Sequence, residues 1–175
     1  MNKEDCTICN LALGRAEFTV YEDDMMKAVL HDKPSTPGQV LLFPKKHYTI
    51  LEQVPDDELE KLFVMANKIS TSVFESLGMH GTNILVNNGV AAGQMYAHFT
   101  IQIIPRMEND GLNLEWKTKQ LSEEEMSTVE LILKPLAENP FAKKEEAKPI
   151  VQEEARHKLP DDSQNYLVRQ LRRIP

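Results

Sequence analysis

The sequence predicts an α+β domain in which a mainly antiparallel sheet is covered by a long helix. Three short apolar or β-branched runs come first, one long helical stripe follows, and two more strand-like runs come after it. Strands and helices therefore do not alternate as they do in parallel α/β folds. The chain has 175 residues, of which 41% are apolar and 27% charged, as is usual for a globular domain with an appendage.

The first three strands are expected around Phe18–Tyr21, Met26–His31 and Gln39–Phe43, because Gly, Pro and Asp separate these short runs. A Cys-containing turn, Cys6–Cys9, precedes them. Between the second and third runs, Lys33-Pro-Ser-Thr-Pro-Gly38 consists of turn-forming residues. These two strands are therefore expected to pair as antiparallel neighbours.

The clearest element is a helix that Pro55 opens and Gly78 closes. Its first turn contains Asp56, Asp57 and Glu58, whose negative charges suit the N-terminal end of a helix dipole. Apolar residues recur along the helix at helical spacing and form one stripe, which is expected to pack on the sheet. The stripe consists of Leu59, Leu62, Phe63, Ala66, Ile69, Val73 and Leu77.

Two further strands are expected at Thr82–Asn88 and His98–Pro105, and the loop Gly89–Gln94 separates them. A second helix is expected over Ser122–Glu138, with Ser122 as the N-cap and Glu125 completing a capping box. The predicted domain therefore covers residues 1–138.

A flexible linker is expected over 139–162, because Pro, Lys and Glu are frequent there and large apolar residues are few. Helical spacing returns over 163–175, where a C-terminal helix with an apolar face is expected. That face consists of Tyr166, Leu167, Leu171 and Ile174.

The composition excludes several classes of protein. No apolar run reaches the roughly 18 residues of a membrane helix, and the start of the chain lacks the apolar core of a signal peptide, so a cytoplasmic location is expected. The formal net charge of −7 divides into −9 for residues 1–138 and +2 for the rest. An acidic body makes general nucleic-acid binding unexpected. Any phosphate site should therefore be small and local.

In the last expected strand, polar residues alternate with apolar ones, so that His98, Thr100 and Gln102 share one face. This pattern alone also fits an amphipathic edge strand with a solvated face. The preceding loop favours a binding site, because its amides and bare backbone N–H groups adjoin the polar face and such a loop can wrap an anion. The loop residues in question are Asn87, Gly93 and Gln94.

Cys6 and Cys9 are too few and too close together to form a disulfide framework. In a reducing compartment they indicate a metal or redox pair, and two thiolates need about two more ligands for tetrahedral zinc. The alternatives are a surface thiol pair and a thioredoxin-like motif, the latter disfavoured because no βαβ pattern follows. The candidate further ligands are His31, His47, His80, His98 and His157.

The segment Gly93-Gln-Met-Tyr-Ala-His-Phe-Thr-Ile-Gln-Ile-Ile-Pro-Arg106 resembles the signature of the histidine triad (HIT) family, small nucleotide-binding hydrolases and transferases whose motif is His-x-His-x-His. The resemblance covers about residues 4–115 and implies a HIT-like fold. Further matching pieces stand in family order. They are Cys6-Thr-Ile-Cys9, Tyr21-Glu-Asp, His31-Asp32, Pro44-Lys-Lys-His47 and Asn83-Ile-Leu-Val-Asn87.

The triad is degenerate, because its first histidine is His98, its second position is Thr100 and its third is Gln102. In the family, the second histidine is the nucleophile that attacks the α-phosphate and carries the nucleotidyl group. A threonine hydroxyl must first lose a proton to a nearby base before it attacks. Gln102 resembles the glutamine of transferase branches, which holds a phosphate oxygen.

The resemblance therefore implies a protein that binds a purine nucleotide, either a nucleoside monophosphate or a dinucleotide, without the usual turnover on histidine. Two alternatives stay open. One is a nucleotide hydrolase or phosphorylase that uses another nucleophile or a water oriented by Gln102, Thr100 and His98. The other is a non-catalytic interaction protein.

The resemblance also assigns the remaining site residues. Asp32 matches the acidic residue that accepts hydrogen bonds from the ribose hydroxyls, and Asn87, Gly93 and Gln94 match positions around the phosphate. His47 and His98 resemble the two histidines that complete a structural Cys-Cys-His-His zinc site with Cys6 and Cys9. Family members of this kind form two-fold dimers through the long helix and a sheet edge, so a homodimer is expected.

Overall fold

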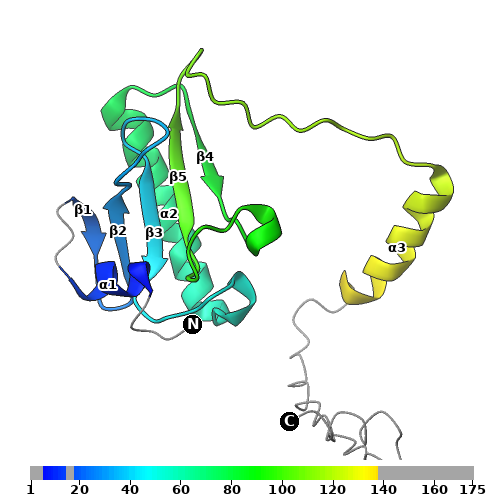
Figure 1. Cartoon of the computed structure of the whole chain (residues 1–175), viewed down its shortest axis with the longest axis horizontal. Helices are drawn as coiled ribbons and strands as arrows, with labels where there is room; N and C mark the ends of the chain where they lie inside the picture. The colour runs from blue at the N-terminus through cyan, green and yellow to red at the C-terminus, as the bar shows by residue number, and fades with distance from the viewer. Residues whose placement is uncertain (1–5, 15–17, 138–175) are drawn as a thin grey trace, which may run out of the picture. The chain divides into compact units, whose positions relative to one another are not determined.

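The computed structural model describes residues 6–14 and 18–137. A five-stranded sheet has the strand order β1-β2-β3-β5-β4, and every neighbouring pair is antiparallel (Figure 1). The predicted α+β class is confirmed, and β2 pairs with β3 as the intervening turn predicts. The strands are β1 (Thr19–Glu22), β2 (Met26–Leu30), β3 (Val40–Pro44), β4 (Gly81–Leu85) and β5 (Ile101–Arg106).

The long helix α2 (Asp56–Leu77) ends as expected, because Gly78 adopts the left-handed conformation with φ 62°. The helix α3 (Glu123–Ala137) begins with the predicted capping box, in which the Ser122 backbone N–H donates to Glu125 Oε2 and the Glu125 N–H donates to Ser122 Oγ. Two short 3₁₀ turns are also present in the described part of the chain. η2 (Leu51–Gln53) comes directly before α2, and η3 (Val90–Ala92) lies between β4 and β5.

The expected turn at the two cysteines is a helix, α1 (Thr7–Leu13). A seven-residue helix is marginal in water on its own. Ile8, Cys9 and Ala12 are buried against the sheet, so packing rather than local propensity forms this element. Periodicity over so short a segment does not predict it.

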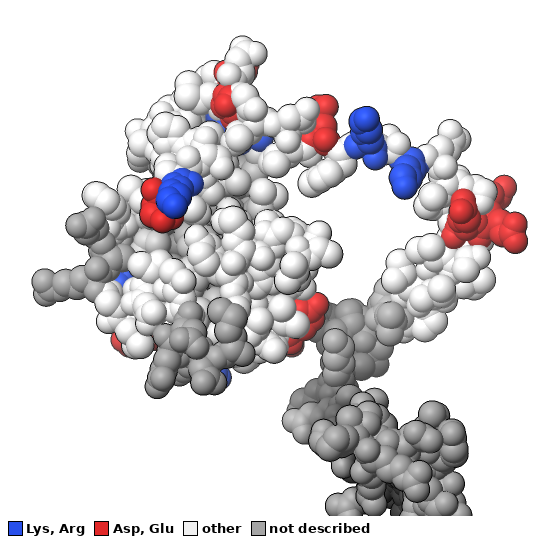
Figure 2. Space-filling view, in the orientation of Figure 1, with Lys and Arg blue, Asp and Glu red and all other residues white. Residues whose placement is uncertain are grey.

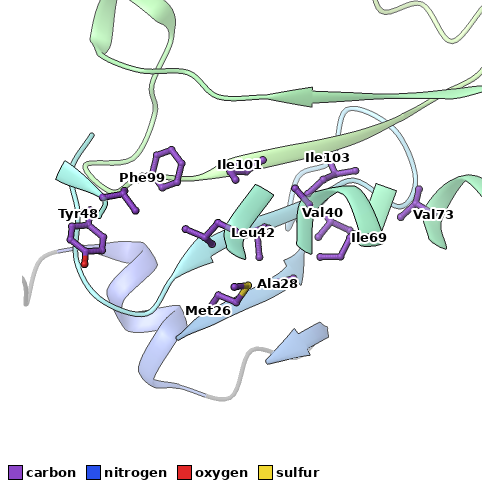
Figure 3. Packing of buried hydrophobic residues seen from close by; sticks show 13 residues of the cluster. Met26, Ala28, Val40, Leu42, Tyr48, Ile69, Val73, Phe99, Ile101 and Ile103 are labelled. Carbon is purple, nitrogen blue, oxygen red and sulfur yellow. The ribbon is translucent and has the colours of Figure 1, made fainter. Parts of the chain in front are cut away.

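The main core lies between the sheet and α2. Val40 and Leu42 of β3 lie in one buried cluster with Ile69 of α2 (Figure 3). Leu62 and Ala66 of α2 belong to the same cluster. Burial of a large aliphatic side chain contributes about 1.5–3 kcal/mol. Most of the apolar stripe that was predicted for the helix therefore packs on the sheet as expected, whereas its members Phe63 and Leu77 are exposed.

A second, smaller core lies on the opposite face of the sheet, where α1 packs (Figure 1). The alternate residues of the strands supply it, since Val29, Leu41 and Phe43 point to this face. Ile8 and Ala12 of α1 cover them. The central strands β2, β3 and β5 are therefore largely buried on both faces, and α1 connects the second core to the two cysteines.

The last strand begins later than expected, because β5 starts at Ile101 and not at His98. The Phe99 N–H donates to the Tyr48 carbonyl at 2.6 Å, so this segment pairs with the chain after β3 and leaves the regular ladder. His98 is fully buried. The predicted alternation nevertheless holds, because Phe99, Ile101 and Ile103 belong to the main core. His98 lies on the other face with Gln102, since it contacts Cys6 and Cys9 of the second core and Gln102 pairs with Leu41 of that core.

The described residues up to Trp116 form one compact unit, and α3 belongs to a second unit that begins at Lys117. The expected linker over 139–162 and the C-terminal helix over 163–175 lie outside the described residues, so the domain limits stay a prediction. Among the helices that the structure describes, none is long and apolar enough to cross a membrane.

Candidate functional site

Two cysteines and two histidines from separate parts of the chain meet beside the second core. Cys6 and Cys9 come from the start of α1, His47 follows β3 and His98 precedes β5. Their ligand atoms all lie within 4.8 Å of one another. Cys9 Sγ lies 3.1 Å from His47 Nδ1 and 3.5 Å from His98 Nδ1, and Cys6 Sγ lies 3.6 Å from His98 Nδ1.

These distances fit a tetrahedral metal site. A zinc ion with bonds of about 2.3 Å to sulfur and about 2.0–2.1 Å to nitrogen holds sulfur and nitrogen about 3.6 Å apart. Cys6 and Cys9 are buried and no disulfide joins them. The four residues that the resemblance assigns to zinc are therefore brought together, and the donor set of two thiols and two imidazoles is one that zinc prefers.

The environment of His98 keeps its ring neutral, as a metal ligand requires. Burial lowers the pKa of His98 to about 4, against the effect of a hydrogen bond with the Pro44 carbonyl. That carbonyl lies 2.9 Å from Nε2 and can only accept, so Nε2 carries the proton. The lone pair of Nδ1 then faces the two sulfur atoms.

A cavity of about 440 Å³ adjoins this cluster on the same face of the sheet. Its volume is in the range of small-molecule sites. Asp32 is in its lining, as the resemblance assigns, and α1 contributes one wall through Thr7 and Leu11. The other lining residues are Phe18, Val29, Leu30, His31, Leu41 and Tyr96.

Sequence reasoning missed several of these lining residues. His31 is a candidate metal ligand by sequence but is not in the four-residue cluster. Its side chain is only 7% exposed, lies in the cavity wall and has its Nδ1 3.2 Å from Asp32 Oδ1. Its Nδ1 accepts the Lys33 backbone N–H at 3.0 Å. The position of His31 directly before Asp32 was the available signal. No sequence signal brings Tyr96, from the distant loop, to the same wall.

Gln102 lies beside the cavity and is held in one orientation. It pairs with Leu41, which lines the cavity, and paired residues of neighbouring strands share a face. Gln39 Oε1 accepts the Ser35 backbone N–H at 2.7 Å, so Gln39 Nε2 is the group that donates to Gln102 Oε1, at 3.1 Å. The amide NH₂ of Gln102 is left to donate elsewhere.

Thr100 is half-buried and stands two residues before Gln102, just ahead of β5. Neither ring nitrogen of the preceding histidine, His98, is turned to it, because Nδ1 faces the cysteines and Nε2 bonds the Pro44 carbonyl. Within the described part of the chain, the hydroxyl of Thr100 therefore has no histidine base from its own strand.

Asn87 and Gln94, which the resemblance assigns to the phosphate site, use their side chains mainly for hydrogen bonds to the backbone in and next to the loop. Gln94 Oε1 accepts the Gly89 N–H, and Gln94 Nε2 donates to the carbonyls of Thr49 and Tyr96. Asn87 Nδ2 donates to the Gly93 carbonyl at 3.1 Å. Gly93 has a φ of 81°, which favours glycine. The loop is thus fixed by its own side chains, and its backbone remains the candidate contact for an anion.

The comparisons agree with this geometry. A model of the HIT domain matches residues 15–109. The chain is 37% identical to the adenylylsulfatase HINT3 of Arabidopsis thaliana over 68% of its own length, and the match spans 59% of that protein. A HIT family protein of Bacillus subtilis superposes with a TM-score of 0.70 at 29% identity, covering 75% of this chain and 96% of that one. A zinc-bound histidine triad protein of Mycobacterium smegmatis gives 0.60 at 27% identity, covering 78% and 99%.

Proposed function

Since the chain belongs to the HIT family, we propose that it binds a purine nucleotide, a nucleoside monophosphate or a dinucleotide, without the nucleotidyl transfer to histidine. The observation that carries the proposal is a formed cavity next to a nucleophile position that Thr100 occupies. The Arabidopsis relative named as an adenylylsulfatase supports an adenosine-containing ligand.

The binding half of the site is supported by groups of complementary chemistry. Asp32 in the cavity lining offers a carboxylate to ribose hydroxyls, and Gln102, which pairs with the lining residue Leu41, offers its fixed NH₂ as a donor to a phosphate oxygen. The apolar lining of the cavity, including Leu41 and Tyr96, suits a planar base. Lys and Arg atoms do not gather into a patch on the face in Figure 2, which argues against general nucleic-acid binding.

The lack of turnover rests on the environment of Thr100. Its hydroxyl needs a base to become nucleophilic. His98 cannot serve, because one ring nitrogen faces Cys6 and Cys9 and the other bonds a backbone carbonyl. The same engagement argues against the alternative in which His98 orients a hydrolytic water.

Calorimetric titration with AMP and adenosine, beside a chromatographic assay for cleavage of adenosine dinucleotides and phosphoramidates, tests the proposal. AMP should bind the wild type, and Asp32→Asn should weaken binding while the matched Asp24→Asn does not, because Asp24 does not line the cavity. Thr100→His should create cleavage, since the ligand is already positioned. A wild type that turns over at about 1 per second or faster would overturn the proposal, and absence of nucleotide binding would favour the interaction protein.

We further propose that the four-residue cluster holds a structural zinc ion. Two thiolates and two imidazoles would occupy all four tetrahedral positions and leave none open for substrate, which is typical of structural zinc. When bound there, the ion would link α1 to the segments that carry His47 and His98 and would stabilise the fold. The zinc-bound relative from Mycobacterium smegmatis supports this assignment.

A homodimer is proposed for the same protein. The strand β4 lies at the edge of the sheet and pairs with β5 alone, so its outer backbone groups are open to pairing. Large apolar side chains are exposed nearby, with Ile84 on β4 and Phe63 and Phe74 on α2. An expected cytoplasmic location stays a prediction.

A further inference from the structure

Lys27 is a lysine in an unusual place, since its side chain is only 1% exposed. It lies on β2 and points to the face of the sheet that carries α1. A buried ammonium group is costly unless it is bonded. Its Nζ donates to the Gly14 carbonyl at 2.7 Å and lies 3.3 Å from Glu22 Oε2.

Of these two partners, the Gly14 carbonyl is the closer to Lys27 Nζ. Glu22 is shared with Lys45, whose Nζ lies 2.8 Å from Oε1, and Lys45 is the main cause that lowers the pKa of Glu22. Lys27 therefore serves chiefly the carbonyl at the C-cap of α1, Gly14. No step proposed for the cavity uses this lysine, and it does not line the cavity.

The helix that Lys27 holds is also a wall of the cavity. Thr7 and Leu11 of α1 line it. The helix has seven residues and no side-chain cap at its N-terminus, so tertiary contacts decide its position. The cluster of Cys6 and Cys9 holds the N-terminal end, and Lys27 holds the other.

We infer that Lys27 is a positioning residue for the nucleotide cavity, acting through α1. With Lys27 in place, the C-terminal end of α1 is fixed on the sheet and Leu11 stays against the cavity. Without it, that end of the helix frays and the wall loosens, while the cysteines stay with the metal site. This inference rests on the proposed nucleotide binding, and its test separates the two.

The test compares Lys27→Met with Lys45→Met in the full-length, zinc-loaded protein. Both variants remove one positive partner of Glu22, but only the first removes the bond to Gly14. Lys27→Met should weaken AMP binding by about fivefold or more, the lower end of usual coupling between sites. Zinc content should be equal in both variants. The backbone amide of Gly14 should exchange hydrogen faster in Lys27→Met than in Lys45→Met, whereas that of Asn10, which donates to the Cys6 carbonyl at the held end, should change less.

A measurement on the wild type covers the case in which Lys27→Met does not fold. Because coupling is reciprocal, saturating AMP should slow exchange at Gly14, whose N–H donates to the Asn10 carbonyl at 2.9 Å. AMP that binds without slowing this exchange, or equal exchange at α1 in the two variants, overturns the inference. If AMP does not bind the wild type, the proposed function fails, and the exchange comparison alone decides whether Lys27 holds α1.

Discussion

Gln39→Glu tests the hydrogen-bond chain that orients Gln102. Gln39 is buried, and its Oε1 accepts the Ser35 N–H while its Nε2 donates to Gln102 Oε1. A carboxylate of the same shape keeps the acceptor for Ser35 but has no N–H to donate. Gln102 should then turn its NH₂ toward the new carboxylate and its carbonyl oxygen toward the ligand.

The expected magnitude follows from the loss of one hydrogen bond to a charged phosphate. Such a bond contributes about 1.5–3 kcal/mol, which corresponds to about a 10- to 150-fold weaker affinity for AMP. Adenosine has no phosphate, so its affinity should change little. The effect of Gln39→Glu is therefore expected in the difference between the two ligands rather than in either alone.

Calorimetric titration of both ligands measures this difference. Gln53→Glu is the matched control, because Gln53 Oε1 also accepts a backbone N–H, that of Thr49 at 2.7 Å, on an exposed turn. It adds the same charge without touching Gln102. Equal weakening of AMP and adenosine by Gln39→Glu, or unchanged AMP binding, would refute the role of Gln102 as a phosphate donor.

Three further predictions follow from other parts of the fold. Purified protein should carry about one zinc per chain by elemental analysis, and Cys6→Ser with Cys9→Ser should remove it and lower the melting temperature; unchanged values would exclude the metal site. Ile84→Lys should convert the dimer to a monomer in sedimentation analysis. A dimer that persists would show that the interface does not include this part of β4. Arg106 and the Leu112 N–H hold the pKa of Asp110 well below its usual value. In urea unfolding, the free energy by which the wild type is more stable than Asp110→Asn should therefore be complete above about pH 4 and shrink at lower pH. A difference that stays constant with pH would contradict this.

Several features could be predicted from the sequence because they depend on neighbours along the chain. The turn at Lys33-Pro-Ser-Thr-Pro-Gly38 brought β2 and β3 together, and the capping box at Ser122 began α3 as expected. The stripe on α2 identified the main core. In each case the deciding interaction, a turn, a cap or a helical face, joins residues only a few positions apart.

The candidate site was predictable only in part. The pair Cys6 and Cys9 indicated a metal site, but the residues alone left five histidines as partners, and the resemblance selected His47 and His98. The structure brings these four together. Strand alternation placed His98 on the correct face, but it did not predict that His98 is fully buried or that the regular strand begins only at Ile101, because the chain bonds to Tyr48 before β5 begins.

The sequence by itself determined the class of fold, the order of the strands and of α2 and α3 along the chain, and the threonine at position 100, where the resemblance expects the second histidine. Only the tertiary structure decided that α1 is a helix, that Lys27 is buried beneath its end, and that Thr7 joins Asp32 around one cavity. The physical reason is that these contacts join residues far apart in sequence. Packing and desolvation create them, and neither has a local pattern that the sequence displays.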